Sequence, residues 1–354
     1  MNWFQRLAYR PLFIRLFHWE YWSFNTVYVP IYIVWIGLCI RARSFFFFAA
    51  SNPTIQNGGF LNESKKDISL LIPSSIHPKT VFCSIPANAD IVLQELYKNG
   101  LSFPMIGKPD IGGRGRGVKA LKDEQDVRAY VKNAFLDFHI QEFVPYKNEA
   151  GFFYYRFPNE KAGNLSGIVR KEFLKVTGNG TSNIYELLQK NKRAVLQLPA
   201  LKKIFGEDLF RILPKGEEKI LVPYGNHARG AMFIDDSEFI DEALTHTIDK
   251  ICKQIDGFYF GRLDIRYNNW EELKQGKNFF VIEVNGAGSE PTHIYDPAHS
   301  LFFAWKEIIR HWILLWRISR INHKNGYSYL TLQEGIRMFR EDKIISQKLS
   351  AMTE

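Results

Sequence analysis

Several features are scarce in this 354-residue sequence, and each absence excludes a class of protein. The chain has only three cysteines, Cys39, Cys83 and Cys252, which lie far apart and form no CxxC pair. No disulfide framework or zinc site is implied, and a reducing compartment is the simpler interpretation. The pattern GxxxxGK[ST] is also absent, which excludes a Walker-type phosphate loop. There is no internal repeat and no low-complexity tract.

The composition indicates a folded, basic protein. Hydrophobic residues make up 46% of the chain, aromatic residues 15% and charged residues 23%. This balance supports a sizeable core, and the length suits one large domain or two to three small ones. The net charge of +9 favours anionic partners such as a nucleotide, nucleic acid or acidic lipid. Nucleic acid is disfavoured, because the aromatic residues gather in apolar runs and do not alternate with Lys and Arg.

The first fifty residues differ from the rest of the chain. Residues 27–40 are strictly apolar, and a helix of that length spans about 21 Å, against roughly 30 Å for the hydrocarbon core of a bilayer. Arg15 precedes this run, and Arg41 and Arg43 follow it, so the flanking charges define no orientation. We favour a membrane-embedded or interfacial anchor. A buried core helix and a true membrane span remain as alternatives.

Turn-rich residues 51–75 form a connector, after which the sequence predicts alternating strands and helices. The last helix starts at Thr331, where Thr331 and Glu334 have the spacing of a capping box. Strands are predicted at residues 80–85, 103–109, 139–145, 151–157, 167–176, 258–267 and 278–286, and helices at 89–100, 124–135, 182–196, 243–255 and 298–319.

A glycine-rich stretch follows the strand at 103–109. Glycines let backbone amides approach phosphate oxygens without a Cβ in the way. Lys108, in the strand just before, supplies a point charge that could reach the same phosphates. A glycine-rich hairpin with solvated Arg114 and Arg116 is the alternative, since this motif alone is weak evidence. The glycines concerned are Gly112, Gly113, Gly115 and Gly117.

Two later strands carry acidic residues at alternating positions. In GRLDIRY, the period of two places Arg262 and Asp264 on one face. In FFVIEVNG, the same period places Glu283 and Asn285 on one face, and Phe280, Ile282 and Val284 on the other.

The polar link between these strands predicts a hairpin. With its turn near residues 273–274, Asp264 lies opposite Glu283, and directly opposed Cβ atoms are about 5 Å apart. Two carboxylates that close repel each other unless a cation lies between them. Ligands that are all oxygen select a hard ion, Mg²⁺ or Mn²⁺. The alternative is a surface face on which the acids pair with Arg262 and Arg266.

In their order and spacing these motifs resemble the ATP-grasp superfamily, especially D-alanine–D-alanine ligases and the ligase part of cyanophycin synthetases. The resemblance covers roughly residues 103–297, through KPDIGGRGRGV, IQEFVPYKNEAG, GRLDIRY and FFVIEVNGAGSEP. It implies an α+β fold in which two subdomains grip ATP. The expected domains are a hydrophobic, helical segment at 1–50, a connector and reduced preceding region at 51–102, the ATP-grasp domain at 103–297 and C-terminal helices at 298–354.

The resemblance also implies a role for each matching residue on the nucleotide. Lys108 would bind the α- and β-phosphates, and the amides around Gly112, Gly113, Gly115 and Gly117 would close over the β- and γ-phosphates. Glu142 and Val144, which flank Phe143, would present groups to the adenine edge. Glu149 would accept the ribose hydroxyls. Apart from the resemblance, the period of two places Lys171 and Lys175 on one strand face, and one of them could reach the γ-phosphate, although a solvated strand edge explains them equally well.

The remaining roles concern the metal ions and the reacting groups. Asp264 and Glu283 would hold a first Mg²⁺, and Glu283 and Asn285 a second, while Arg262 would face the transferring phosphoryl group. Members of the family activate a carboxylate as an acyl phosphate, which an amine then attacks. His227 and Arg229 are candidates for binding a substrate carboxylate or phosphate, and His293 for contacting substrate. For each of these three, a simple turn residue is the alternative.

Two parts of the chain depart from the family pattern. The region before residue 103 is too short for the usual preceding domain, so no substrate site can be carried over. The predicted helix at 298–319 mixes Trp305, Trp312 and Trp316 with Lys and Arg, which is typical of an interfacial helix, with a core helix as the alternative.

Together, these patterns predict a cytoplasmic ligase on the inner face of a membrane. It would use ATP and Mg²⁺ to join a carboxylate to an amine, and the resemblance suggests a homodimer. A phosphotransferase and a non-catalytic nucleotide-binding scaffold are the alternatives.

Overall fold

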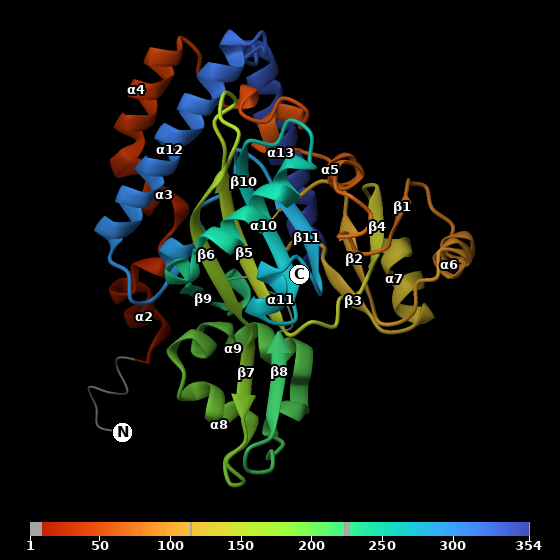
Figure 1. The fold of residues 1–354 in the computed structure, drawn as a ribbon. Coiled ribbons are helices and arrows are strands. Elements are labelled where there is room, and N and C mark those ends of the chain that lie inside the picture. The colour runs from red at the N-terminus through yellow and green to blue at the C-terminus, as the bar shows by residue number, and fades with distance from the viewer. Residues whose placement is uncertain (1–8, 114, 223–224, 226, 354) are drawn as a thin grey trace. The chain divides into compact units, whose positions relative to one another are not determined.

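The chain forms two compact units, neither of which is continuous in the sequence. The computed structural model describes residues 9–113, 115–222, 225 and 227–353 (Figure 1). The first unit comprises Met1–Ile33, Val169–Asp236 and Thr292–Glu307, and the second comprises Val34–Ile168, Ser237–Pro291 and Ile308–Glu354. Helices and antiparallel strands occur in both units, which confirms the expected α+β class.

In the second unit, a four-stranded antiparallel sheet carries the strand that precedes the glycine-rich loop. The strand order is β1-β4-β2-β3, and helices α6 and α7 share its core, in which Met105, Val127 and Ile140 are fully buried. Asn88 and Asp123 begin these helices, because their side chains accept hydrogen bonds from backbone amides of the first turn. The elements are β1 (Thr80–Cys83), α6 (Ala89–Lys98), β2 (Met105–Pro109), β3 (Lys119–Leu121), α7 (Glu124–Asn133) and β4 (Phe138–Glu142).

A second antiparallel sheet of this unit carries the acidic strands. β10 pairs with both β5 and β11, and the register sets Asp264 opposite Glu283 and Arg262 opposite Asn285. The predicted opposition of the two carboxylate positions is therefore confirmed. The elements are β5 (Asn148–Tyr155), β6 (Asn164–Glu172), α10 (Glu242–Lys253), β10 (Phe260–Tyr267), α11 (Trp270–Lys274), β11 (Phe279–Asn285) and the short turn η7 (Ser237–Phe239).

Two local predictions about the acidic hairpin were wrong. The link is not a simple turn, because Asn269 caps the short helix α11. The strict alternation in β11 also fails, because a β-bulge leaves Ile282 without a partner between Val281 and Glu283. Val284 consequently joins Val281 in the core and does not share a face with Ile282.

The remaining helices of the second unit form an aromatic cluster. α4 contributes Trp35 and Leu38, and α12 contributes Trp312, whose ring lies 5.2 Å from that of Trp35. Trp316 is 8% exposed and belongs to this core cluster, and Trp312 is partly buried and packs against it. The elements are α4 (Tyr32–Ala42), η3 (Phe47–Ala50), η4 (Gln56–Gly59), α5 (Lys65–Leu71), α12 (Leu301–Lys324) and α13 (Leu332–Thr353).

Within the described residues, one helical stretch is long and apolar enough to cross a membrane. It covers Phe24–Ala42, and 28% of it is buried. It starts three residues earlier than the apolar run at 27–40, because Ser23 accepts a hydrogen bond from the amide of Thr26 and caps α3. At 19 residues its length is about 28 Å, close to the thickness of the hydrocarbon core.

The first unit holds the remaining small elements. β7 and β8 pair antiparallel beside α8 and α9, and the end of β6 pairs with β9. The single helix predicted at 182–196 is two helices, because Asn191 caps a new one shortly after the first ends. The elements are α2 (Pro11–Phe17), η1 (Trp19–Tyr21), α3 (Phe24–Tyr28), η2 (Val29–Ile31), β7 (Leu174–Thr177), α8 (Ile184–Gln189), α9 (Lys192–Phe205), η5 (Gly206–Phe210), β8 (Glu218–Val222), η6 (His227–Arg229), β9 (Met232–Asp235) and η8 (Thr292–Tyr295).

Candidate functional site

Lys108 reaches from the first sheet of the second unit to the acidic strand. Its Nζ atom donates to Gln141 Oε1 at 2.8 Å and to the carbonyl oxygen of Ile282 at 3.4 Å. The pKa of Lys108 is lowered to about 8, mainly by burial and also by the charge of Lys65, whereas the charge of Glu283 acts in the opposite direction. Ile282 directly precedes Glu283, so Lys108, the predicted phosphate ligand, contacts the backbone next to Glu283, a predicted metal ligand.

A small cavity of about 20 Å³ lies beside Lys108, which is room for about one water molecule. Lys65, His77, His139 and Gln141 line it. Burial, followed by the charge of Lys108, lowers the pKa of His77 to about 4 and that of His139 well below its usual range, so both rings are neutral near pH 7. The sequence patterns did not identify any of these four residues.

Backbone and side-chain contacts hold the glycine-rich loop at both ends. Gly112, Gly115 and Gly117 have positive φ angles of 128°, 67° and 72°, which glycine tolerates best. Lys65 Nζ contacts the carbonyl oxygen of Gly112, and Tyr130 donates to that of Gly117 at 3.0 Å. A Cβ on Gly113 would meet nothing within 4 Å. Arg114 lies outside the described residues.

Arg266 connects the predicted adenine and ribose residues to strand β10. Its Nε atom pairs with Glu149 Oε2 at 3.1 Å, and Nη1 donates to the carbonyl oxygen of Val144 at 3.0 Å. The guanidinium also lies 5.5 Å from the ring centroid of Phe143. Glu142, at the end of β4, accepts from the amide of Lys79 at 3.3 Å. Three of the four predicted residues, Phe143, Val144 and Glu149, are thus held near one cation.

The four residues at the ends of β10 and β11 form the most polar part of the sheet. Arg262 binds both carboxylate oxygens of Asp264, with Nε–Oδ1 at 2.8 Å and Nη2–Oδ2 at 3.3 Å. Asp264 is 3% exposed. Within the described part of the chain, the Glu283 side chain has no hydrogen-bond partner, and the buried Asn285 Nδ2 atom has none either.

This donor set suits a hard divalent ion. Asp264, Glu283 and Asn285 offer carboxylate and amide oxygens on paired strands, which is the chemistry of Mg²⁺ and Mn²⁺ sites. The unpaired Nδ2 atom of Asn285 is an N–H donor, so it indicates a missing acceptor, whereas a metal ion would bind the Oδ1 atom of the same amide. Across the described residues, no group of three or more His, Cys, Asp and Glu side chains could hold a metal, so the amide would be needed.

The other predicted residues lie in the first unit. Lys171 is buried in β6, opposite Phe233, and Arg229 is half-buried in η6. His293 is 3% exposed, and its Nε2 atom lies 3.5 Å from Glu307 Oε2.

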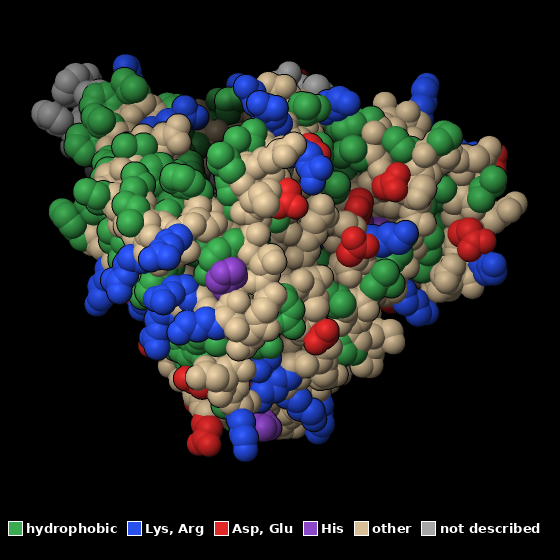
Figure 2. Space-filling view, turned by 90° about the horizontal axis from the view of Figure 1, so that it is seen from above, with side chains coloured by type: hydrophobic (Ala, Val, Ile, Leu, Met, Phe, Trp, Pro, Cys, Tyr) green, Lys and Arg blue, Asp and Glu red, His purple; other side chains and the backbone are tan. Residues whose placement is uncertain are grey.

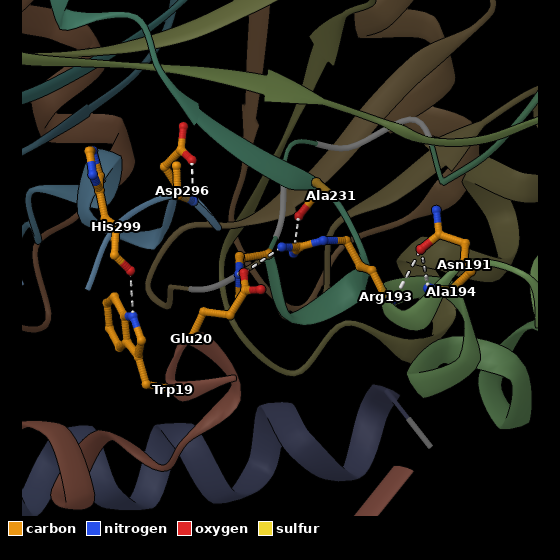
Figure 3. A network of polar contacts seen from close by, with 10 residues as sticks. Trp19, Glu20, Asn191, Arg193, Ala194, Ala231, Asp296 and His299 are labelled. Carbon is orange, nitrogen blue, oxygen red and sulfur yellow. Dashed lines mark hydrogen bonds and ion pairs between the residues drawn. The ribbon is translucent and has the colours of Figure 1, made fainter. Parts of the chain in front are cut away.

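His227 belongs to a buried network in the same unit. Its Nε2 atom is 3.2 Å from Glu20 Oε2. Figure 3 shows Glu20 and Arg193 pointing toward each other, with the Ala231 carbonyl on the guanidinium. No sequence pattern linked Glu20 or Arg193 to His227. The substrate roles of His227, Arg229 and His293 stay predictions.

No protein-family model and no curated protein matches this sequence. Among solved structures, the D-alanine–D-alanine ligase from Bacillus anthracis is 14% identical, with a TM-score of 0.43 and coverage of 76% of this chain and 71% of that one. The VanG D-Ala:D-Ser ligase from Enterococcus faecalis is 16% identical, with a TM-score of 0.40 and coverage of 72% of this chain and 61% of that one. A bifunctional glutathione synthetase from Pasteurella multocida is 15% identical, with a TM-score of 0.38 and coverage of 71% of this chain and 35% of that one.

The likeness to these solved structures is limited in extent. This chain spans only 61% and 35% of the lengths of the last two proteins, and all three TM-scores are below 0.5. These structures therefore assign no function to this chain.

Proposed function

We propose that this protein is an ATP-dependent ligase that joins a carboxylate to an amine and forms ADP and phosphate. One observation carries the proposal: Lys108, next to the glycine-rich loop, contacts the backbone of the strand that bears Glu283 and Asn285. A fixed cation, a glycine-rich loop and an acidic metal-ligand set in one unit can supply the charge stabilisation and alignment that phosphoryl transfer requires.

Each residue has a defined task in this reaction. The Lys108 ammonium and the amides of the glycine-rich loop bind phosphate oxygens, and the Arg262 guanidinium stabilises the charge of the transferring phosphoryl group. Asp264, Glu283 and Asn285 would hold Mg²⁺ or Mn²⁺, which when bound screens phosphate charge and aligns the reactants.

The bonds balance without a nucleophile from the protein. A substrate carboxylate oxygen attacks the γ-phosphorus, the bond from that phosphorus to the β,γ-bridging oxygen breaks, and ADP leaves with an acyl phosphate formed. The amine then attacks the acyl carbon, the bond between that carbon and the phosphate oxygen breaks, and phosphate leaves. The amine proton passes to solvent or phosphate.

Phosphate release tests the ligase proposal. The detergent-purified full chain receives Mg-ATP and pools of carboxylates and amines, beside Asp264→Asn and the matched control Glu271→Gln, an exposed acid on α11. We expect the parent and the control to release phosphate, and amide to appear by mass spectrometry, only when both substrates are present. Asp264→Asn should be inactive.

The other outcomes each select an alternative. A phosphorylated product without free phosphate would replace the ligase by a phosphotransferase. Protection of the fold by ATP without any turnover of the pools would favour a nucleotide-binding scaffold.

We also propose that the protein is cytoplasmic and docks on an anionic membrane surface through α4. Ile33, Ile36 and Ile40 recur at helical spacing and are 76%, 52% and 71% exposed. Hydrophobic side chains gather at the left of Figure 2, the side on which Figure 1 places α4. Arg41 and Arg43 follow, and residues 21–62 contain no Asp or Glu, which suits an anionic lipid surface.

Vesicle flotation tests the docking proposal. The parent should float with vesicles of phosphatidylglycerol and phosphatidylcholine, and less with phosphatidylcholine alone. Replacing Ile33, Ile36 and Ile40 by Ser should abolish flotation, whereas the matched change at the exposed Ile204 and Ile344 should not. Equal flotation of both variants would refute docking through α4.

A further inference from the structure

The C-terminal helix α13 packs against the glycine-rich loop. Leu349 is 1% exposed. A Cβ on Gly112 would lie 2.5 Å from Leu349 Cδ1, and one on Gly117 would lie 3.6 Å from Leu349 Cδ2. Arg116, between the two glycines, donates from Nη1 to the carbonyl oxygen of Ser346 at 3.3 Å. Both ends of the loop and its middle therefore contact the same turn of α13.

Contacts far from the loop fix the position of α13. The helix begins at the Thr331–Glu334 capping box, and a Cβ on Gly335 would lie 2.3 Å from the Phe46 ring. One turn later, Asn62 Nδ2 donates to the carbonyl oxygen of Met338 at 2.8 Å. Leu349 lies fourteen residues after Gly335, which is about 21 Å along the helix. Packing elsewhere in the unit therefore supports the part of α13 that leads to Leu349.

We propose that α13 is a positioning element of the nucleotide site, in which Leu349 and the Ser346 carbonyl hold the glycine-rich loop in its binding shape. This inference rests on the proposed ATP-dependent function. A glycine-rich segment loses much conformational freedom when it becomes ordered. A loop that is already ordered loses less on binding, so the nucleotide binds more tightly. Leu349 acts through the loop and has no role in the chemistry itself.

The experiment compares Leu349→Ala with Ile344→Ala in the full chain. Both remove aliphatic carbons from α13, but Ile344 is 54% exposed and faces away from the loop's contacts. Leu349→Met serves as the conservative variant, because it keeps the volume and the apolar contact. The first readout is the rate of trypsin cleavage after Arg116 without nucleotide. The second is the Kd for Mg-ATP by calorimetry.

We expect Leu349→Ala to be cleaved several-fold faster than Ile344→Ala and to bind Mg-ATP about tenfold more weakly, with Leu349→Met near the parent in both readouts. Equal cleavage rates, or equal Kd values, for Leu349→Ala and Ile344→Ala would overturn the proposal. If the parent itself does not bind Mg-ATP, the proposed function fails and the positioning role with it, while the cleavage rates still show whether α13 holds the loop.

Discussion

The buried ion pair between Glu20 and Arg193 offers the sharpest test of the tertiary structure. Arg193 Nη2 lies 2.5 Å from Glu20 Oε2, and the two side chains are 8% and 6% exposed. The guanidinium also donates to the Ala231 carbonyl oxygen at 2.9 Å and lies 5.3 Å from the Tyr21 ring centroid. Glu20 is in the N-terminal segment, so this pair fastens that segment to the rest of the first unit.

Glu20→Gln should destabilise the protein by about 3–5 kcal/mol, because the charge of Arg193 stays buried without its partner. The loss of stability in Arg193→Met should lie at the lower end of that range, because Glu20 keeps one partner, His227, whose Nε2 atom is 3.2 Å from Glu20 Oε2. The Ala231 carbonyl also loses its donor, which costs about 1–3 kcal/mol. The double variant should cost less than either single variant, because neither charge is then stranded.

Urea unfolding followed by tryptophan fluorescence measures these differences, with Trp19 next to the pair and bonded to the His299 carbonyl at 2.9 Å. The control is Glu218→Gln, which breaks the exposed pair with Lys175 and should change stability by less than about 1 kcal/mol. A loss below about 1 kcal/mol for Glu20→Gln, or additive effects in the double variant, would refute the reasoning.

The same pair predicts a pH dependence. Burial raises the pKa of Glu20, but the hydrogen bond from His227 and the charge of Arg193 outweigh it, so the pKa is lowered in the folded protein. The pair therefore stabilises the fold fully above the unfolded pKa of about 4.3, and this stabilisation is lost as the pH falls through the folded pKa. When the pH is lowered from 7 into the acid range, the free energy of unfolding should therefore fall less for Glu20→Gln than for the parent.

Three further changes test the site and its frame. With the pKa of Lys108 near 8, the Kd for Mg-ATP should rise about tenfold between pH 7 and 9 as the ammonium deprotonates, and a flat calorimetric profile would contradict this role. Gly261→Ala would place a Cβ 2.1 Å from the Asn285 carbonyl oxygen, so the β10–β11 hairpin should shift, with a lower melting temperature and lost phosphate release. Thr331→Ala removes the cap of α13 and should cost about 1 kcal/mol in urea unfolding; no change would show that the cap is dispensable.

Local patterns in the sequence determined the elements and much of the candidate site. The period of two placed Arg262 with Asp264, and the length of the link set Asp264 opposite Glu283, as the register confirms. The capping box at Thr331 formed as predicted. These predictions succeed because a strand's faces, a cap and a hairpin's register depend on residues close together in the chain.

Only the tertiary structure decided which distant residues meet. The bulge at Ile282 moves Val284 into the core. The alternation of apolar and polar residues in the sequence does not predict where a bulge occurs. Glu20 and His227 are 207 residues apart in the sequence, and Leu349 reaches Gly112 from the far end of the chain. Periodicity encodes which face of an element is apolar, but it does not encode which partner covers that face. The packing of whole helices and sheets decides that, and it brought Lys108 to the acidic strand and α13 to the glycine-rich loop.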